Sequence, residues 1–249
     1  MAFRAGFRAI DTANQRRHYF EEAVGDAVHA VLADGEVSRA DLFLQTKFTY
    51  SWSQDMRLPY DIGASPAVQV TQSVESSLRH LRTGYIDSYL LHSPSTPGRL
   101  TDEDWQVWST MHGLQRAGVI GLVGVSNVSL AQLRMFPQEL MPAIVQNPYR
   151  LQRGGQREVL DFCQANGIAY QGFGILTANK SRLASPAVLR IAQRTGRTPA
   201  QVLIRLACQR GVVPVTGPSD PAHMREALAC EEFCLSEQDV ECLEGTGEL

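Results

Sequence analysis

Short apolar runs alternate with longer amphipathic segments along the 249-residue chain. The short runs are mostly apolar on both faces, which is typical of parallel strands covered by helices. They predict strands at Arg8–Ala13, Leu42–Phe48, Ser88–His92, Leu122–Ser126, Ala143–Gln146, Ala169–Phe173 and Val212–Val215. The longer segments repeat their apolar residues with the period of a helix. They predict helices at Glu21–Leu32, Ala67–Leu81, Asp102–Ala117, Arg157–Asn166 and Pro199–Gln209.

Residues at the helix boundaries support several of these predictions. Ser65 followed by Pro66 is typical of a helix start, and Gly118 and Gly167 directly follow two of the predicted helices. The segment Thr49–Ala64 is the longest irregular stretch. Because it follows a predicted strand, it lies where the functional loops of a barrel are found.

The alternation predicts an α/β fold with a parallel sheet and right-handed crossovers. No long linker interrupts it, so we expect a single domain over residues 1–249. Seven strands are one fewer than a closed (β/α)8 barrel needs. A doubly wound open sheet is the alternative, but its Gly-rich fingerprint is absent after the first strand, and the glycines of "GLVGVSN" enter a strand. We therefore predict a (β/α)8 TIM-barrel type that is incomplete, with seven strands.

Composition argues against several classes of function. A net charge of −3 argues against a nucleic-acid partner, which needs a basic surface. No apolar run approaches the ~20 residues that cross a membrane, and the N-terminus lacks the apolar core of a signal peptide. The five cysteines are odd in number and fit reduced thiols in a cytoplasmic protein. Cys230 and Cys234 lack the further ligands of a zinc site, so we expect no metal.

Polar and aromatic residues follow successive predicted strands at their C-terminal ends, where the chemistry of a (β/α) barrel gathers. These residues are Asp11, Lys47, His92, Ser126 with Asn127, Gln146, Phe173, and Thr216 with Gly217. Taken alone, each has an ordinary explanation: Asp11 could serve a turn or cap, Lys47 a solvated strand end and His92 the core. Tyr19 alone could be an aromatic residue at a helix start. Their joint occurrence is what indicates a site.

Asp11, Tyr19, Lys47 and His92 together suit proton transfer to a carbonyl group. A tyrosine hydroxyl is a weak acid, with a reference pKa of about 10. A nearby ammonium stabilises the phenolate and lowers that pKa, and a carboxylate keeps the ammonium charged and oriented. A neutral histidine can hydrogen-bond the carbonyl and fix its direction. The hydride must come from a cofactor, because no side chain can donate one.

The chain resembles the aldo-keto reductases over essentially its whole length. The motifs that carry the resemblance are "GFRAIDTA", "LFLQTKF", "SSLRHLRTGYIDSYLLHSP", "GLVGVSN", "IVQNPY" and "VTGPSDPAHMREAL". It implies that Asp11, Tyr19, Lys47 and His92 are the catalytic tetrad, with Tyr19 as the proton donor. Many members have the tyrosine where this chain has Arg16, but a subgroup similar to "DTA-x-Q-x-x-H-Y" uses the later tyrosine. A guanidinium also cannot release a proton near neutral pH.

The same resemblance implies a nicotinamide cofactor. Ser126, Asn127 and Gln146 match residues that hydrogen-bond the carboxamide, which uncharged donors and acceptors suit. Phe173 matches an aromatic residue, usually tyrosine, that stacks on the nicotinamide ring. A further group matches the site of the adenosine-side phosphate, at a helix start that favours anions. This group is Thr216, Gly217, Ser219, His223 and Arg225.

The expected cofactor is NADPH, with NADH as the alternative. Family members often have a lysine where this chain has Val215, and an arginine where it has His223. Arg225 could compensate for both changes. The preference for NADPH therefore depends on Arg225.

Two functions of different class follow from the resemblance. The first is a monomeric NADPH-dependent reductase that converts an aldehyde or ketone, a small-molecule carbonyl substrate, to an alcohol. The second is a non-catalytic nucleotide-binding relic or regulatory subunit, because the family's first βα unit has no counterpart before "AGFR". Retention of all four tetrad residue types favours the reductase. Tyr50, Trp52 and Tyr60 suggest that the substrate enters an apolar, aromatic-lined cleft.

Overall fold

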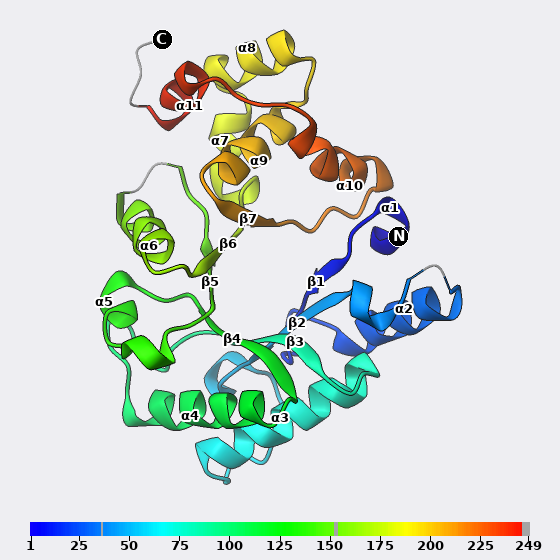
Figure 1. The fold of residues 1–249 in the computed structure, drawn as a ribbon, viewed down its shortest axis with the longest axis vertical. Coiled ribbons are helices and arrows are strands. Elements are labelled where there is room, and N and C mark those ends of the chain that lie inside the picture. The colour runs from blue at the N-terminus through cyan, green and yellow to red at the C-terminus, as the bar shows by residue number, and fades with distance from the viewer. Residues whose placement is uncertain (36, 152–153, 246–249) are drawn as a thin grey trace. The chain divides into compact units, whose positions relative to one another are not determined.

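The structure is a computed structural model that describes residues 1–35, 37–151 and 154–245 (Figure 1). The described residues form seven strands, whose order in the sheet is their order in the sequence. The strands are β1 (Ala9–Asp11), β2 (Phe43–Phe48), β3 (Ile86–Leu91), β4 (Ile120–Ser126), β5 (Ile144–Pro148), β6 (Ala169–Phe173) and β7 (Val212–Val215).

At least one helix lies between each strand and the next along the chain. The helices of the described residues are α1 (Ala2–Ala5), α2 (Glu21–Ala33), α3 (Pro66–Leu81), α4 (Asp102–Arg116), α5 (Leu130–Leu133), α6 (Gly154–Ala165), α7 (Lys180–Leu183), α8 (Pro186–Thr195), α9 (Pro199–Gln209), α10 (Pro221–Leu228) and α11 (Glu237–Glu244). The strand pairs β1–β2, β2–β3, β3–β4 and β6–β7 are parallel. The predicted fold class, a (β/α)8-barrel type with seven strands, is therefore confirmed.

The chain divides into two compact units. The N-terminal unit is Arg8–Val145, and the C-terminal unit combines Met1–Phe7 with Gln146–Leu249. The expectation of a single domain over residues 1–249 stays a prediction.

Strands β2 and β3 form the centre of the N-terminal unit. Leu44, Phe48, Tyr89 and Leu90 on these strands are almost entirely buried. Helix α3 contacts β2, α4 contacts β3 and β4, and the two helices lie side by side (Figure 1). Burial on both faces explains why most positions of β3 are apolar, whereas β2 also buries the polar residues Gln45, Thr46 and Lys47.

Helix α9 forms the centre of the C-terminal unit. It contacts α8, α10 and β7, and its residues Val202, Leu203 and Leu206 are fully buried or nearly so. Thr198 caps the helix by accepting a hydrogen bond from the Gln201 backbone N–H. Pro199 lies in the first turn, where a backbone N–H has no partner within the helix, so a proline loses no helical hydrogen bond there. The apolar stripe of α9 and its cap explain why its predicted bounds, Pro199–Gln209, are those of the structure.

The predicted boundaries agree with the structure to different degrees. Strands β6 and β7 have the predicted bounds, while β1 is shorter than the predicted strand Arg8–Ala13. Ser65 and Pro66 do begin α3, and Gly118 adopts a left-handed conformation, with φ 75°, just after α4. The sequence prediction omits α8 and α11, although Ser185 caps α8.

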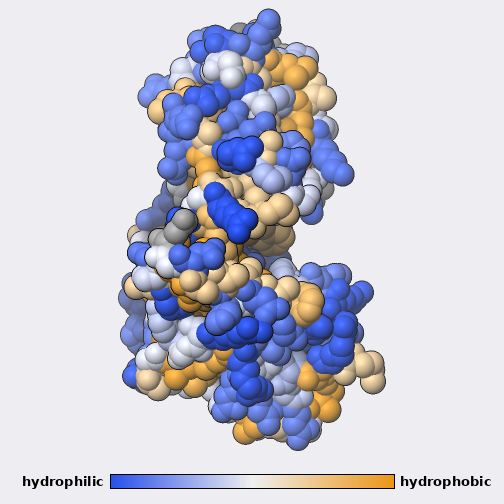
Figure 2. All heavy atoms as spheres, turned by 90° about the vertical axis from the view of Figure 1, so that its right-hand side faces the viewer, coloured by the Kyte–Doolittle hydropathy of each residue, from blue (hydrophilic) through white to orange (hydrophobic). Residues whose placement is uncertain are grey.

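The face of the molecule that Figure 2 shows is largely polar. Hydrophilic residues cover most of the face in Figure 2, with apolar residues in patches between them. Among the residues with a described position, no helix has the length and apolar character needed to cross a bilayer.

Helices α2 and α3 approach each other closely at Gly25. A Cβ atom at Gly25 would lie 1.9 Å from the backbone oxygen of His80, where an α-carbon without a side chain is the only fit. The contact is with backbone, so no side-chain rotation could relieve it. Gly25 therefore sets the distance at which α2 packs on α3.

Gly25→Ala should reduce the free energy of unfolding by about 3 kcal/mol, because the added methyl group forces the two helices apart. The matched control is Gly113→Ala in α4, where an added Cβ meets nothing within 4 Å. That change should raise stability by about 1 kcal/mol through helix propensity. Urea unfolding measures both changes, and equal effects at the two sites would contradict the close-contact explanation.

Candidate active site

A buried ion pair joins the ends of β1 and β2. The Lys47 Nζ atom lies 2.7 Å from both carboxylate oxygens of Asp11 and 2.9 Å from the backbone oxygen of Thr12. The Lys47 side chain is 1% exposed and that of Asp11 is 17% exposed. Burial lowers the pKa of Lys47, and the Asp11 carboxylate opposes that shift. Asp11 thus favours the charged ammonium, whereas burial favours the neutral amine.

Two further residues at β2 take part in the site, Gln45 on the strand and Thr49 directly after it. Gln45 Nε2 donates to Asp11 Oδ1 at 2.6 Å, and the Thr49 hydroxyl lies 2.7 Å from Nδ1 of His92. The sequence analysis did not predict either residue. Gln45 and Lys47 are two positions apart, so they share one face of the strand, and Thr49 continues the same spacing beyond its end. This spacing of two is the sequence signal that could have identified both residues.

A buried acidic residue of α2, Glu21, lies beside the opposite face of β2. The Glu21 carboxylate, 2% exposed, accepts hydrogen bonds from Thr46, Ser77 and His80. The hydrogen bond to Glu21 raises the pKa of His80. Glu21 also acts, after Asp11, to raise the pKa of Lys47 against the effect of burial. The sequence analysis did not single out this cluster.

Tyr19 lies in the segment between β1 and α2, with its backbone N–H bonded to the Gln15 oxygen at 3.0 Å. Lys47 Nζ is 5.5 Å from the centre of the Tyr19 ring, and the His92 ring meets it edge-on, with centroids 5.8 Å apart. The structure therefore brings Asp11, Tyr19, Lys47 and His92 together, as predicted.

The pKa of Tyr19 differs from the prediction. The sequence analysis expected the ammonium to lower it, but burial, followed by the Asp11 charge, raises it. Both causes penalise the phenolate: burial removes water from it, and the carboxylate repels it. Tyr19 is therefore a neutral phenol at pH 7 and can serve as a proton donor.

His92 directly follows β3. Its backbone N–H donates to the Phe48 oxygen at 2.9 Å, which fixes the residue beside the end of β2. Burial, followed by the Lys47 charge, lowers the pKa of His92 to about 4. The imidazole is therefore neutral at pH 7, as the sequence chemistry required.

Arg16, which takes the position of the commoner tyrosine, has surface partners. Its guanidinium forms an ion pair with Glu22 at 3.0 Å and lies over the Phe20 ring, 4.1 Å from its centroid. An always-charged group in this pairing cannot release a proton. The geometry is consistent with the choice of Tyr19 over Arg16.

Ser126 and Asn127 lie next to His92. Ser126, 1% exposed, ends β4, and Asn127 follows in the left-handed conformation with φ 54°. The Asn127 amide donates to the His92 backbone oxygen at 2.9 Å and to Ser126 Oγ at 3.2 Å. Asparagine tolerates this backbone region better than most residues, so the conformation places an amide beside the tetrad.

An open pocket of about 230 Å³ begins beside His92 in the N-terminal unit. Of the three aromatic residues predicted to face the substrate, Tyr50 and Trp52 line it and Tyr60 does not. Tyr60 is buried, and its hydroxyl donates to the Thr49 backbone oxygen at 2.7 Å. Ser93, Thr49, Ser53 and Asn127 complete the lining together with His92, so the pocket is part aromatic and part polar.

The C-terminal unit carries the other predicted cofactor residues. Gln146 on β5 is 3% exposed, and its amide donates to Gln171 Oε1 at 2.9 Å. Phe173 ends β6 and is paired in register with Val215 of β7. Phe173 is half-buried, and its backbone oxygen accepts from the Tyr149 N–H at 2.8 Å.

The predicted phosphate residues follow β7. Thr216, Gly217 and Ser219 lie between β7 and α10, while His223 and Arg225 are exposed on α10. The Asp220 carboxylate caps α10 by accepting from the Ala222 N–H at 2.6 Å. One backbone donor at this helix start thus already binds a carboxylate within the chain.

Within the part of the chain that the structure describes, no three His, Cys, Asp or Glu side chains form a group that could hold a metal ion. Cys230 and Cys234, considered above as zinc ligands, are free thiols.

The family model for the "Aldo/keto reductase family" matches residues 1–248. The chain belongs to this family. "Aldo-keto reductase family 1 member C3" from Homo sapiens is 30% identical over 275 residues, which cover 98% of this chain and 80% of the relative. "Dihydrodiol dehydrogenase 3" from Bos taurus is 29% identical over 274 residues, with the same two coverages.

Solved aldo-keto reductases have the same fold. The enzyme from Brucella melitensis has a TM-score of 0.83 at 26% identity, over 98% of this chain and 85% of that one. An aldo-keto reductase complexed with NADPH has a TM-score of 0.82 at 27% identity, over 99% of this chain and 76% of that one. The resemblance inferred from the motifs is thus confirmed.

The low pKa of His92 should make stability depend on pH. Its folded value of about 4 lies below its ordinary value of 6.5, so the unfolded chain takes up the proton first as the pH falls. The contribution of neutral His92 to the free energy of unfolding is fully present above pH 6.5. It is lost as the pH falls toward 4, by as much as about 3 kcal/mol. His92→Gln should flatten this part of the stability profile, measured by urea unfolding from pH 7 to 4.5.

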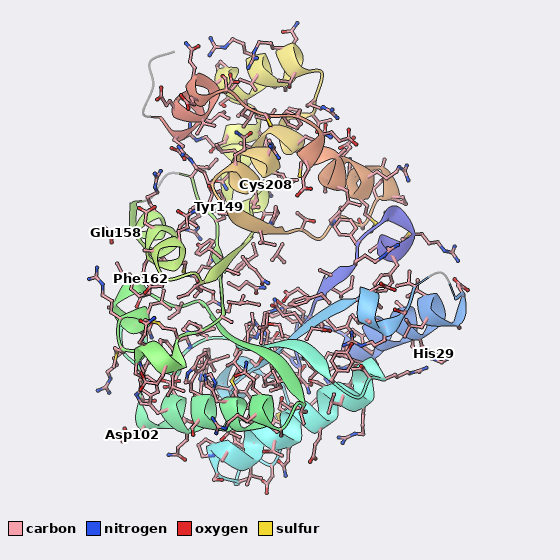
Figure 3. The ribbon with its side chains drawn as sticks, in the orientation of Figure 1. His29, Asp102, Tyr149, Glu158, Phe162 and Cys208 are labelled. Carbon is pink, nitrogen blue, oxygen red and sulfur yellow. The ribbon has the colours of Figure 1, made fainter. Side chains whose placement is uncertain are left out.

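The control is His29→Gln, because His29 is exposed on α2 (Figure 3). It removes a histidine without touching the tetrad. If wild type and His92→Gln lost stability equally over this range, burial of a neutral His92 would be refuted.

Proposed function

We propose that this chain is an NADPH-dependent reductase that converts an aldehyde or ketone to an alcohol. One observation carries the proposal: Lys47 is held by both oxygens of Asp11, 5.5 Å from the Tyr19 ring, which meets the ring of a neutral His92. Membership of the aldo/keto reductase family and the NADPH complex of a relative support the same activity.

Tyr19 is the proton donor in this proposal. Its raised pKa keeps the phenol protonated at neutral pH until negative charge develops on the carbonyl oxygen. Lys47 then stabilises the phenolate that remains, because its ammonium lies close to the ring. Asp11 acts through Lys47, since it keeps the buried ammonium charged and in place.

His92 orients the carbonyl group. The Thr49 hydroxyl bonds its Nδ1, which fixes the ring, and we assign Nε2 to the carbonyl oxygen. Because the imidazole is neutral, it can offer a hydrogen bond without adding a second charge to the site. The adjoining pocket would take the rest of the substrate, with Trp52 and Tyr50 as its apolar wall.

The residues proposed for the cofactor suit a nicotinamide dinucleotide. When bound, it supplies the hydride that no side chain can give. Uncharged amide and hydroxyl groups on Ser126, Asn127 and Gln146 match a carboxamide, and Phe173 offers an aromatic face to the ring. Thr216, Gly217, Ser219 and His223 would contact the adenosine side, with Arg225 as the cation for the phosphate that distinguishes NADPH from NADH.

The test mixes the purified full chain with NADPH and a panel of aldehydes and ketones, and follows the absorbance of the reduced cofactor. Substrate-dependent oxidation of NADPH, with alcohol recovered, is the expected result. NADPH binding without turnover of any carbonyl would contradict the reductase and support a nucleotide-binding protein without catalysis.

Tyr19→Phe should lower kcat/KM by about 10²–10⁴-fold, because it removes the proton donor while keeping the ring. NADPH affinity, measured by fluorescence titration, should stay unchanged. The matched control is Tyr85→Phe, a partly exposed tyrosine that lies under Arg39, and it should keep full activity. Loss of activity in Arg16→Ala but not in Tyr19→Phe would show that Tyr19 is the wrong donor.

Arg225→Ala should raise the KM for NADPH by about tenfold, because a charge-assisted hydrogen bond to phosphate is lost. The KM for NADH should change little, since NADH lacks that phosphate. Arg116→Ala, an exposed arginine on α4, is the control for loss of a surface cation. Equal changes for both cofactors would contradict the assignment of Arg225.

A further inference from the structure

Two thiols that have no role assigned above lie close together in the C-terminal unit. Cys208 is near the end of α9, where Figure 3 labels it, and Cys230 is in the short 3-10 helix η5 (Ala229–Glu232). Their sulfur atoms are 3.9 Å apart, and both cysteines are free. Cys230 is 3% exposed, whereas Cys208 is half-buried and can be reached from solvent.

Hydrogen bonds hold the two elements that carry these thiols. The Gln209 side chain accepts from the Leu235 N–H at 2.7 Å and donates to the Leu235 oxygen at 3.0 Å. Gln201, earlier on α9, donates to the Glu226 backbone oxygen at 3.1 Å. The chain is thus fastened to α9 on both sides of Cys230. These bonds hold the backbone of both cysteines in place. Rotation of the two side chains is the movement that would bring the sulfur atoms into bonding distance.

The two thiols differ in exposure, which decides which of them an oxidant meets first. Cys208 is half-buried and Cys230 is 3% exposed, so Cys208 is the thiol that a peroxide can reach. The hydrogen bond from Cys230 lowers the pKa of Cys208, against burial and the Glu231 charge, which raise it, and the Arg205 charge also lowers it. The same bond and burial raise the pKa of Cys230. The thiolate is the form that attacks an oxidant, which fits attack by Cys208. Burial raises the pKa of Cys163 to about 12.

We propose that Cys208 and Cys230 form a modification site for hydroperoxides, in which Cys208 is oxidised and Cys230 closes the disulfide. The Cys208 thiolate attacks the terminal oxygen of the peroxide, the O–O bond breaks, and the alcohol or water leaves with a proton. The resulting sulfenic acid then reacts with the Cys230 thiol, which forms the S–S bond and releases water. Two thiols are oxidised and one peroxide is reduced. The sulfur atoms close from 3.9 Å to a bond of about 2.05 Å.

Cys234 provides a matched comparison. It lies four residues beyond Cys230, is exposed, and accepts a hydrogen bond from Arg205 at 3.0 Å. If exposure alone decided which disulfide forms, oxidation would link Cys208 to Cys234. A pair chosen by the fixed geometry links Cys208 to Cys230.

The experiment treats the full chain with hydrogen peroxide, blocks remaining thiols with iodoacetamide, and digests it without reductant. Trypsin together with a glutamate-specific protease releases Cys208 in residues 206–210 and places Cys230, Cys234 and Cys242 in the separate segments 227–231, 233–237 and 242–244. The expected result is linkage of 206–210 to 227–231, reversed by dithiothreitol. A digest after oxidation in urea shows the linkages of the unfolded chain. A native pattern equal to that one, or linkage mainly to 233–237, would overturn the proposal.

Substitutions separate the two roles. Cys208→Ser should abolish the linkage, and Cys234→Ser should leave its yield unchanged. Cys230→Ser or Cys230→Ala should leave a sulfenic acid on Cys208 that dimedone labels, because the resolving thiol is gone. Loss of the linkage in Cys234→Ser would refute the assignment. If neither Cys230 variant folds, the wild-type map and Cys234→Ser still decide the question.

Discussion

The site in the N-terminal unit depends on burying one ammonium group. Lys47 is withdrawn from water in the middle of the unit, and Asp11 is the partner that offsets the loss of hydration. Apolar residues of similar volume often replace such a pair without loss of stability, whereas removing one partner costs about 3–5 kcal/mol. Stability of the fold therefore does not account for the pair. The proposed function does account for it, because in that proposal Tyr19 needs a nearby charge, and the ammonium lies near its ring.

Strand β2 contacts an acidic residue on each of its two faces. Lys47 binds Asp11 on one face, and the adjacent Thr46 binds Glu21 on the other. Both acidic residues act to keep Lys47 protonated. The surroundings of the ammonium thus extend through the strand to Glu21 and to His80 on α3, which hydrogen-bonds Glu21. A change of helix packing near α3 could reach the site by this route without touching the tetrad.

Sequence patterns predicted the strands because parallel strands buried on both faces are continuously apolar, and motif order predicted the family. The same patterns singled out Lys47 and Asp11, and the structure shows the ion pair between them. The cluster around Glu21 escaped notice because polar residues in helices look like surface positions until burial is known. For the same reason the pKa of Tyr19 was predicted in the wrong direction: nearby charge can be inferred from motifs, but the extent of desolvation cannot. Helix α8 had recognisable caps at Ser185 and Gly196 that the prediction did not use.

The segment that carries Tyr19 is fastened at both ends to neighbouring residues of one strand. Lys47 holds Asp11 before it, and Thr46 holds Glu21 after it. Residues 12–15 are buried, whereas all five residues 16–20 are partly or fully exposed. Length changes can therefore accumulate in 16–20 while the anchors stay in register. This arrangement makes the Tyr19 loop a separable part of the chain, because its length can change at 16–20 while Asp11 and Glu21 stay bonded to Lys47 and Thr46.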